Sequence, residues 1–231
     1  MSNNNKKSLA IRDKIHEIKN TFNSYSKIQL DSELVELVPI DDSDESIKLM
    51  TKWRNDNMDF FYSKFESTNI KTKKWFSEIY LPNPNRLLFF IIYKNEKIGH
   101  AGIFNFNEEQ NSIILDNFVR EIDKGERGLM ILVELAILKL CFYELKLEKV
   151  FVDLFENNFQ ANLLHKRCGF KIIKKIPLKK IKTNEGWNWI KDETQINSTK
   201  FANILEIKKL EGMGLTSQRY APDSLSCRKY L

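Results

Sequence analysis

Residues 129–145 constrain the fold most, because this run is apolar on nearly every face that a helix would present. A helix of that kind must be buried against another layer, such as a sheet. Apolar segments of strand length lie on both sides of it, at residues 113–119 and 150–155. The stretch 113–170 therefore predicts a strand, a glycine-containing turn, a buried helix, a second strand and a short helix, in that order.

Two charged residues, Glu134 and Lys139, interrupt the apolar run. No segment of about 20 apolar residues remains, so we expect no membrane insertion. Residues 1–7 are polar and no apolar stretch follows them, which argues against a secretory signal. The three cysteines, Cys141, Cys168 and Cys227, lack the spacing of a metal site or a disulfide framework. They predict a protein without a metal site in a reduced, cytoplasmic compartment. We expect Cys141, inside the run, to be a core residue.

The chain has 231 residues and a formal net charge of +6. That length suits one substantial core with extensions. The positive charge fits a polyanion, a charged ligand or solubility alone. Because lysines are spread along the chain with acidic residues between them, we favour a charged ligand or solubility and do not expect a nucleic-acid partner.

The segments around this stretch predict the rest of one domain. Ile11, Ile15, Ile18 and Phe22 recur at helical spacing, which predicts an amphipathic helix in an N-terminal extension, residues 1–32. Further helices are expected at residues 47–53 and 71–79, and strands at 34–40, 86–93, 98–106 and 112–119, the last three as an antiparallel meander. Later in the chain we expect a strand at 171–176 that stops at Pro177 and a last strand at 198–210, with a helix as the alternative there. The tail, 209–231, has no periodicity and is expected to be disordered or a loose extension.

The turn at residues 124–128 carries two glycines, Gly125 and Gly128, directly before the predicted helix. Glycines let backbone amides point outward, and a helix N-terminus adds unsatisfied N–H groups and the positive end of its dipole. Together they favour an anionic phosphate, and Lys124 and Arg127 would add positive charge. Plain turn chemistry is the commoner explanation of such glycines, so both interpretations stay open.

A second motif follows the second strand. Asn158 can cap the short helix, and Gly169 can supply the left-handed residue after it. The spacing Asn158-x-x-Ala161-x-x-x-His165-x-x-x-Gly169-Phe170 is similar to Asn-x-x-Ala-x-x-x-Tyr-x-x-x-Gly-Phe, which is frequent in the GNAT superfamily of N-acetyltransferases. This motif is more specific than the glycine turn.

Residues 113–170 as a whole resemble the acyl-CoA-binding core of that superfamily, and the resemblance extends over about 34–176. It implies an α/β (α+β) fold: one acetyltransferase domain, residues 33–208, with a central, mostly antiparallel, splayed mixed sheet flanked by helices. It also implies an acetyl-CoA-dependent N-acetyltransferase, with acetyl-CoA as cosubstrate.

The resemblance assigns roles to particular residues. The backbone of Phe118 and Val119 would pair with the pantetheine arm where two strands splay apart, and Asn158 would hydrogen-bond that arm. His165 would protonate the departing thiolate. The pyrophosphate would be held by the turn and the start of the helix, on the amides of Lys124, Gly125, Glu126, Arg127, Gly128, Leu129 and Met130.

Two positions depart from the pattern of the superfamily. Gly125 and Gly128 cannot both fill the glycine positions of its usual Gln/Arg-x-x-Gly-x-Gly/Ala. His165 stands where Tyr is common, and an imidazole, with an ordinary pKa of about 6.5, suits proton transfer near neutrality. The alternative is a histidine on the exposed side of a short helix.

The attacking amine must be neutral. At pH 7, deprotonating a Lys-like amine of pKa about 10.4 costs about 4–5 kcal/mol, whereas an α-amino group near 8 costs about 1 kcal/mol. Two candidate bases lie on the predicted strands: Asp116, a carboxylate in an apolar segment, and His100, between Gly99 and Gly102. Their alternatives are a hydrogen-bonded aspartate at a strand end and a core or surface histidine.

Two branches of the superfamily suggest different acceptors. Residues 115–120 with 128–130 resemble the branch that acetylates nucleotide-linked amino sugars for cell-surface polysaccharides, which we prefer. Residues 53–55 with 75–76 resemble the branch that acetylates protein N-termini and ribosomal proteins. A third interpretation is a CoA-binding module without turnover, because the glycine pattern is degenerate and the Tyr is missing. The expected partner is therefore a small-molecule amine, and a homodimer is allowed.

Overall fold

The computed structural model describes residues 3–21, 24–30 and 33–210. Its strands are β1 (Ser26–Leu30), β2 (Glu33–Pro39), β3 (Ser63–Lys64), β4 (Arg86–Tyr93), β5 (Glu96–Asn107), β6 (Ser112–Arg120), β7 (Lys149–Phe155), β8 (Lys171–Thr183), β9 (Gly186–Lys191) and β10 (Phe201–Lys208). Its α-helices are α1 (Asn3–Lys19), α2 (Asp44–Asp56), α3 (Asn69–Trp75), α4 (Leu129–Lys139) and α5 (Phe159–Arg167).

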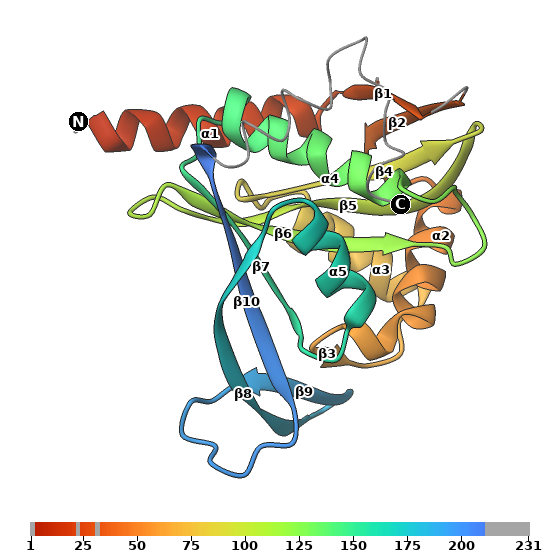
Figure 1. The fold of residues 1–231 in the computed structure, drawn as a ribbon. Coiled ribbons are helices and arrows are strands. Elements are labelled where there is room, and N and C mark those ends of the chain that lie inside the picture. The colour runs from red at the N-terminus through yellow and green to blue at the C-terminus, as the bar shows by residue number, and fades with distance from the viewer. Residues whose placement is uncertain (1–2, 22–23, 31–32, 211–231) are drawn as a thin grey trace.

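Within the described residues, ten strands form one sheet in the order β1-β2-β4-β5-β6-β7-β10-β8-β9-β3. Neighbours run antiparallel except β6 and β7, which are parallel. Helices cover both sides of the sheet, and β8 and β9 extend away from it with one end of β10 (Figure 1). The predicted α/β fold with a mostly antiparallel mixed sheet is confirmed.

Alternation along β4 separates two cores. Leu87 and Phe89 belong to the larger core, which they share with α1 and α4. Leu88 and Phe90 face the other way and pack with Trp53 of α2. Successive side chains of a strand point to opposite faces, so one apolar strand supplies both layers.

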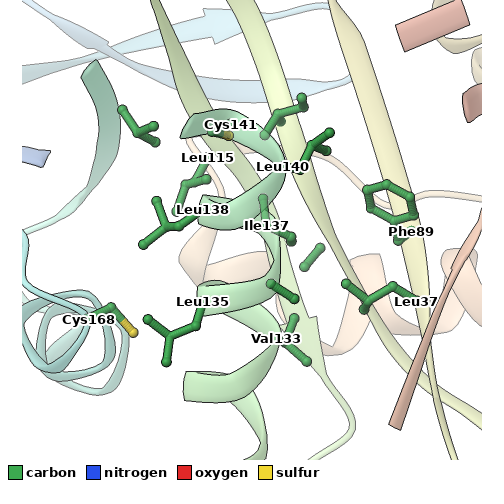
Figure 2. Close-up of a cluster of buried hydrophobic side chains, with 14 of the residues drawn as sticks. Leu37, Phe89, Leu115, Val133, Leu135, Ile137, Leu138, Leu140, Cys141 and Cys168 are labelled. Carbon is green, nitrogen blue, oxygen red and sulfur yellow. The ribbon is translucent and has the colours of Figure 1, made fainter. Parts of the chain in front are cut away.

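Helix α4 fills the larger core, as its apolar sequence predicts. Ile137 and Leu138 are fully buried, and Figure 2 shows the helix packed over the strands that carry Leu37 and Phe89. Regular α geometry ends at Lys139, and the predicted helix continues as one π-helical turn, Leu140–Glu144. Cys141 lies in this core as expected, where burial raises the pKa of its thiol.

The N-terminal helix α1 packs on the same core. Ile11, Ile15 and Ile18 are buried there, as their spacing predicts, and Phe22 lies outside the described residues. Lys19 ends the helix, and its ammonium donates to the carbonyls of Tyr80 (2.9 Å) and Asn83 (2.7 Å). The predicted tail beyond residue 210 also lies outside the described residues.

Two glycines let the central strands approach closely. A Cβ added to Gly102 would lie 2.0 Å from the carbonyl oxygen of Leu87, and one added to Gly99 would lie 2.1 Å from that of Val119. Real Cβ atoms do not come so near to backbone oxygen, so β4, β5 and β6 pack as they do only with glycine at these two positions.

One expected strand needs correction, and three strands were not expected. The strand expected to stop at Pro177 runs on to Thr183, because β8 pairs with β10 up to Pro177 and with β9 from Leu178 onward. Proline's missing N–H is therefore placed where the partner strand changes. Strands β1, β3 and β9 were not predicted. Residues 201–208 form the expected last strand. None of the described helices is long and apolar enough to cross a membrane.

Candidate functional site

Strands β6 and β7 lie side by side for only part of their length. Parallel pairing joins residues 112–114 to residues 149–151. Beyond this, β6 continues to Arg120 and β7 to Phe155, with no pairing between them in the described chain. The strand ends diverge, with α5 beside the opening (Figure 1). This is the predicted splay of the sheet.

A β-bulge around Asn117 marks the start of the divergent part of β6. In the ladder between β5 and β6, His100 faces Val119 and Gly102 faces Asp116, so β6 holds one extra residue. Asn117 adopts φ 55° in the left-handed region. A bulge re-aims the side chains of its strand. Here Phe118 packs against the larger core and Val119 belongs to the smaller one.

His100 supports this bulge. Its Nδ1 lies 2.9 Å from the carbonyl oxygen of Asn117, and its ring lies beside Trp53. Burial lowers the pKa of His100 to about 4, against smaller opposing effects of the Asn117 hydrogen bond and the Asp116 charge. A neutral imidazole that donates Nδ1–H therefore satisfies a buried carbonyl at the bulge. A part for His100 in proton transfer stays a prediction.

The turn between β6 and α4 presents N–H groups that the protein does not use itself. Among the described residues, no backbone hydrogen bond is made by the amides of Gly125, Glu126, Arg127, Gly128 or Met130. Gly125 (φ 83°) and Gly128 (φ 90°) are left-handed, and Gly128 caps the N-terminus of α4. These groups fit the pyrophosphate of CoA, because free amides at a helix N-terminus favour an anion.

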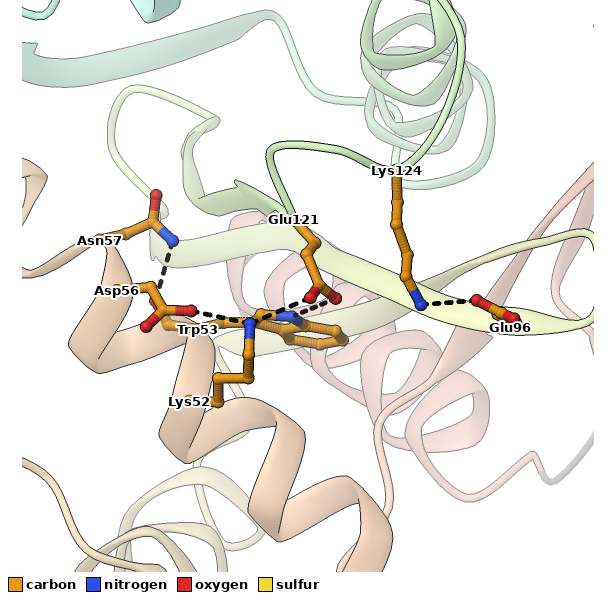
Figure 3. Close-up of polar contacts among 7 residues, drawn as sticks. All are labelled: Lys52, Trp53, Asp56, Asn57, Glu96, Glu121 and Lys124. Carbon is orange, nitrogen blue, oxygen red and sulfur yellow. Dashed lines mark hydrogen bonds and ion pairs between the residues drawn. The ribbon is translucent and has the colours of Figure 1, made fainter.

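Side-chain contacts tie this turn to its surroundings (Figure 3). Glu121 accepts from Lys52 (3.0 Å) and from the Trp53 indole (3.5 Å), both on α2. Lys124 pairs with Glu96 at 2.6 Å. The ammonium of Lys124 is thus already compensated, whereas Arg127 is exposed at the tip.

His165 is buried against the splayed end of β6. Its side chain is 4% exposed, and its Nδ1 lies 2.8 Å from Oε1 of Glu134 on α4. The rings of Phe118 and Phe170 contact the imidazole edge-on, with centroids 5.6 and 5.7 Å away. The alternative of an exposed surface histidine is wrong.

Asn158 begins α5 at the end of β7. Its side-chain oxygen accepts from the amide of Ala161 at 3.2 Å, which confirms the predicted N-cap. The side-chain N–H₂ group makes no protein hydrogen bond among the described residues. A role for Asn158 on the pantetheine arm stays a prediction.

Asp116 lies on the opposite face of the sheet from His165. Its Oδ2 accepts from Nε (3.0 Å) and Nη2 (2.6 Å) of Arg86. The guanidinium carbon lies 4.3 Å from the ring centre of Phe104 and 5.7 Å from that of Trp75. Asp116 is thus a hydrogen-bonded aspartate, as the alternative interpretation expected, and a role for it as the base stays a prediction.

Cations and aromatic rings gather where β7, β8, β9 and β3 meet. Lys200 lies 4.4 Å from the ring centre of Phe155, at the end of β7, and Lys180 lies 3.9 Å from that of Trp187. Burial lowers the pKa of Lys64 to about 8; nearby Asp59 opposes the shift, and Lys200 and Arg54 add to it. The carboxylate of Asp153 is already occupied by Tyr62 and Lys191.

The structure adds Glu134 and Arg86 to the site residues that the sequence suggests. The apolar run 129–145 contains two acids, Glu144 at its end and Glu134 in its interior. An acid inside a helix that must be buried needs a partner. That signal is visible in the sequence. The partner is not, because His165 is far along the chain.

Comparisons with known proteins agree with this geometry. Residues 35–171 match the family described as Acetyltransferase (GNAT) domain. The fold is similar to that of the spermidine N-acetyltransferase from Vibrio cholerae in complex with CoA and spermine, with 13% identity, a TM-score of 0.61, and coverage of 78% of this chain and 98% of that one. It is also similar to apo FdhC, a nucleotide-linked sugar GNAT, with 13% identity, a TM-score of 0.60, and coverage of 86% and 97%. No curated protein matches the chain.

Proposed function

Because the chain belongs to the GNAT acetyltransferase family and uses acetyl-CoA, we propose that it acetylates the primary amine of a nucleotide-linked amino sugar. The amine, in its neutral form, attacks the thioester carbonyl directly. Both of the solved structures described above are acetyltransferases, one for a polyamine and one for a nucleotide-linked sugar, so the fold alone does not select the acceptor.

We place acetyl-CoA in the opening where strands β6 and β7 diverge. The free amides of Gly125, Glu126, Arg127, Gly128 and Met130 hold its pyrophosphate, whereas the amides of Lys124 and Leu129 already bond the carbonyls of Glu121 and Glu126. The divergent part of β6, at Phe118 and Val119, pairs with its pantetheine arm. Acetyl-CoA supplies the activated acetyl group. The thioester then lies between the strand ends, with His165 on one face of the sheet and Asp116 on the other.

The choice of acceptor rests on a group of lysine side chains near aromatic rings at the end of β7. Lys200, Lys64 and Lys180 lie over the aromatic rings there. Burial lowers the pKa of Lys64, and the charges of Lys200 and Arg54 add a smaller effect in the same direction. A nucleotide brings an aromatic base and phosphates, which suit rings and ammonium groups. A polyamine would need free carboxylates, but those of Asp116 and Asp153 are already paired with cations.

A substrate panel tests the proposal. The purified protein is incubated with acetyl-CoA and, in turn, nucleotide-linked amino sugars, spermidine, and peptides with free N-termini; thiol release and product mass are recorded. We expect turnover with the sugars. Faster acetylation of spermidine or of the peptides would refute this choice. No thermal shift with millimolar acetyl-CoA would refute the enzyme itself and favour a module without turnover.

Matched lysine variants test the charged surface. Lys200→Gln should raise KM for the nucleotide substrate about tenfold, as expected for a lost contact of about 1.4 kcal/mol. Lys174→Gln is the control, because Lys174 on β8 is exposed and paired with Glu193 at 2.6 Å. Equal KM values in the two variants would count against a role for this surface.

A further inference from the structure

Glu134 is a buried acid in the middle of the most apolar helix of the protein. Its side chain is 0% exposed, and Oε2 has no hydrogen-bond partner among the described residues. Among the described residues, its side chain makes one hydrogen bond, between Oε1 and Nδ1 of His165 at 2.8 Å. Removing an ionised carboxylate from water costs several kcal/mol unless a partner compensates it. The imidazole is the only such partner within the described chain.

The imidazole is nearly as buried as the carboxylate. Phe118 and Phe170 contact its ring edge-on, and its Nε2 makes no hydrogen bond with a described residue. Phe118 belongs to the divergent part of β6, directly after the bulge residue Asn117. The ring is thus held at Nδ1 by α4 and flanked by β6, and its Nε2 has no hydrogen-bond partner among the described residues.

We propose that Glu134 is a positioning residue: it holds the ring of His165 at Nδ1, so that Nε2 is the nitrogen that delivers a proton to the departing sulfur. This rests on the proposed function, in which His165 is the acid. In an apolar environment, a carboxylate beside an imidazolium is net neutral, whereas the same carboxylate beside a neutral imidazole is a buried net charge. A carboxylate at Nδ1 therefore suits a ring that carries the proton to be delivered on Nε2.

The proton then has a defined path. The amine nitrogen bonds to the carbonyl carbon, the C–S bond breaks, and its electron pair passes to sulfur. The proton on Nε2 of His165 transfers to that sulfur and gives the free thiol of CoA. Glu134 keeps its hydrogen bond at Nδ1 throughout, and the ring regains a proton from solvent after product leaves. The extra proton of the acetylated nitrogen passes to Asp116 or to water.

A purely structural pair is the competing explanation. A buried ion pair often adds little to stability compared with apolar residues of the same shape. Stability alone therefore cannot separate the two explanations. Two other measurements can: the protonation of the His165 ring, and the effect of replacing Glu134 on turnover with and without His165.

The first measurement needs no acceptor amine. Nitrogen-15 spectra of the histidine rings in the free protein, assigned with His165→Ala, should report protons on both nitrogens of His165 at neutral pH. In Glu134→Gln, which keeps the shape and removes the charge, only one should remain. Glu144→Gln is the matched control, since Glu144 lies at the end of the same apolar segment and bonds Tyr25 instead. An unprotonated Nδ1 in the parent protein, or an unchanged ring in Glu134→Gln, would overturn the proposal.

The second measurement is a double-mutant cycle on turnover. Glu134→Gln should lower kcat about 10²-fold, within the range that a positioned acid contributes, and leave the Kd for acetyl-CoA unchanged. In the His165→Ala background it should have no further effect, because Glu134 acts through His165. Additive losses would overturn the proposal. If no amine is acetylated by the parent protein, the proposed function fails while the ring spectra still decide the role of Glu134.

Discussion

His100 makes the folded protein sensitive to mild acid. The imidazole is buried beneath the bulge of β6, and burial lowers its pKa to about 4 from an ordinary 6.5. Between these two values the unfolded chain binds a proton that the folded protein does not. Stability therefore falls as the pH drops through this window, and the contribution of a neutral His100 is fully present only above about pH 6.5.

The size of the effect follows from the two pKa values. One pKa unit corresponds to about 1.4 kcal/mol, so complete protonation costs about 3 kcal/mol of unfolding free energy. At pH 5 the unfolded chain is already protonated at this site and the folded one is not, so the loss relative to pH 7 is about 2 kcal/mol.

Urea denaturation at pH 7 and pH 5 measures this loss. Carboxylates also titrate on the way to pH 5, so the informative quantity is the difference between the parent protein and His100→Gln, whose amide still donates to Asn117 but does not titrate. The parent should lose about 2 kcal/mol more than the variant. His16→Gln, at an exposed position of α1, is the control and should behave like the parent. Equal losses in the parent and His100→Gln would refute the reasoning.

Three further substitutions test other parts of the structure. Gly102→Ala should destabilise far more than Gly128→Ala, because its Cβ meets the Leu87 carbonyl whereas that of Gly128 meets open space and costs about 1 kcal/mol of left-handed strain; equal melting temperatures would contradict this. Ile137→Ala, in the fully buried centre of α4, should lower the unfolding free energy by about 2–5 kcal/mol in urea; a loss below 1 kcal/mol, roughly that of an Ile→Val change, would mean that the core collapses around it. Asp116→Asn should slow acetylation without changing the Kd for acetyl-CoA, and an unchanged rate would remove Asp116 as the base.

The periodic parts of the fold could be predicted from sequence. Residues 129–145 had to form a buried helix, and the apolar runs at 86–93 and 98–106, joined by a short polar turn, had to form a hairpin, because burial of apolar side chains dictates both. The N-cap at Asn158 could also be predicted, since capping depends on neighbours in sequence. These features depend on local chemistry.

The site depended on contacts between distant segments. The bulge at Asn117 exists only relative to its partner strand, where Gly102 faces Asp116, and nothing in the local sequence specifies that register. The same is true of the pair between Glu134 and His165. Strand β8 was cut short at Pro177 because a proline normally ends pairing, whereas here the strand exchanges one partner for another.

The smallest strand bears on the order in which the protein folds. β3 contributes only Ser63 and Lys64, yet they pair with Asn188 and Trp187 of β9, far away in sequence. Closing so long a loop is entropically costly, so such pairing follows the local hairpins that make up the central strands. The pair of strands β3 and β9, which carries Lys64 and Trp187, should thus form last during folding and separate first in the folded protein. Such local separation would let an acceptor enter without disturbing the core around α4.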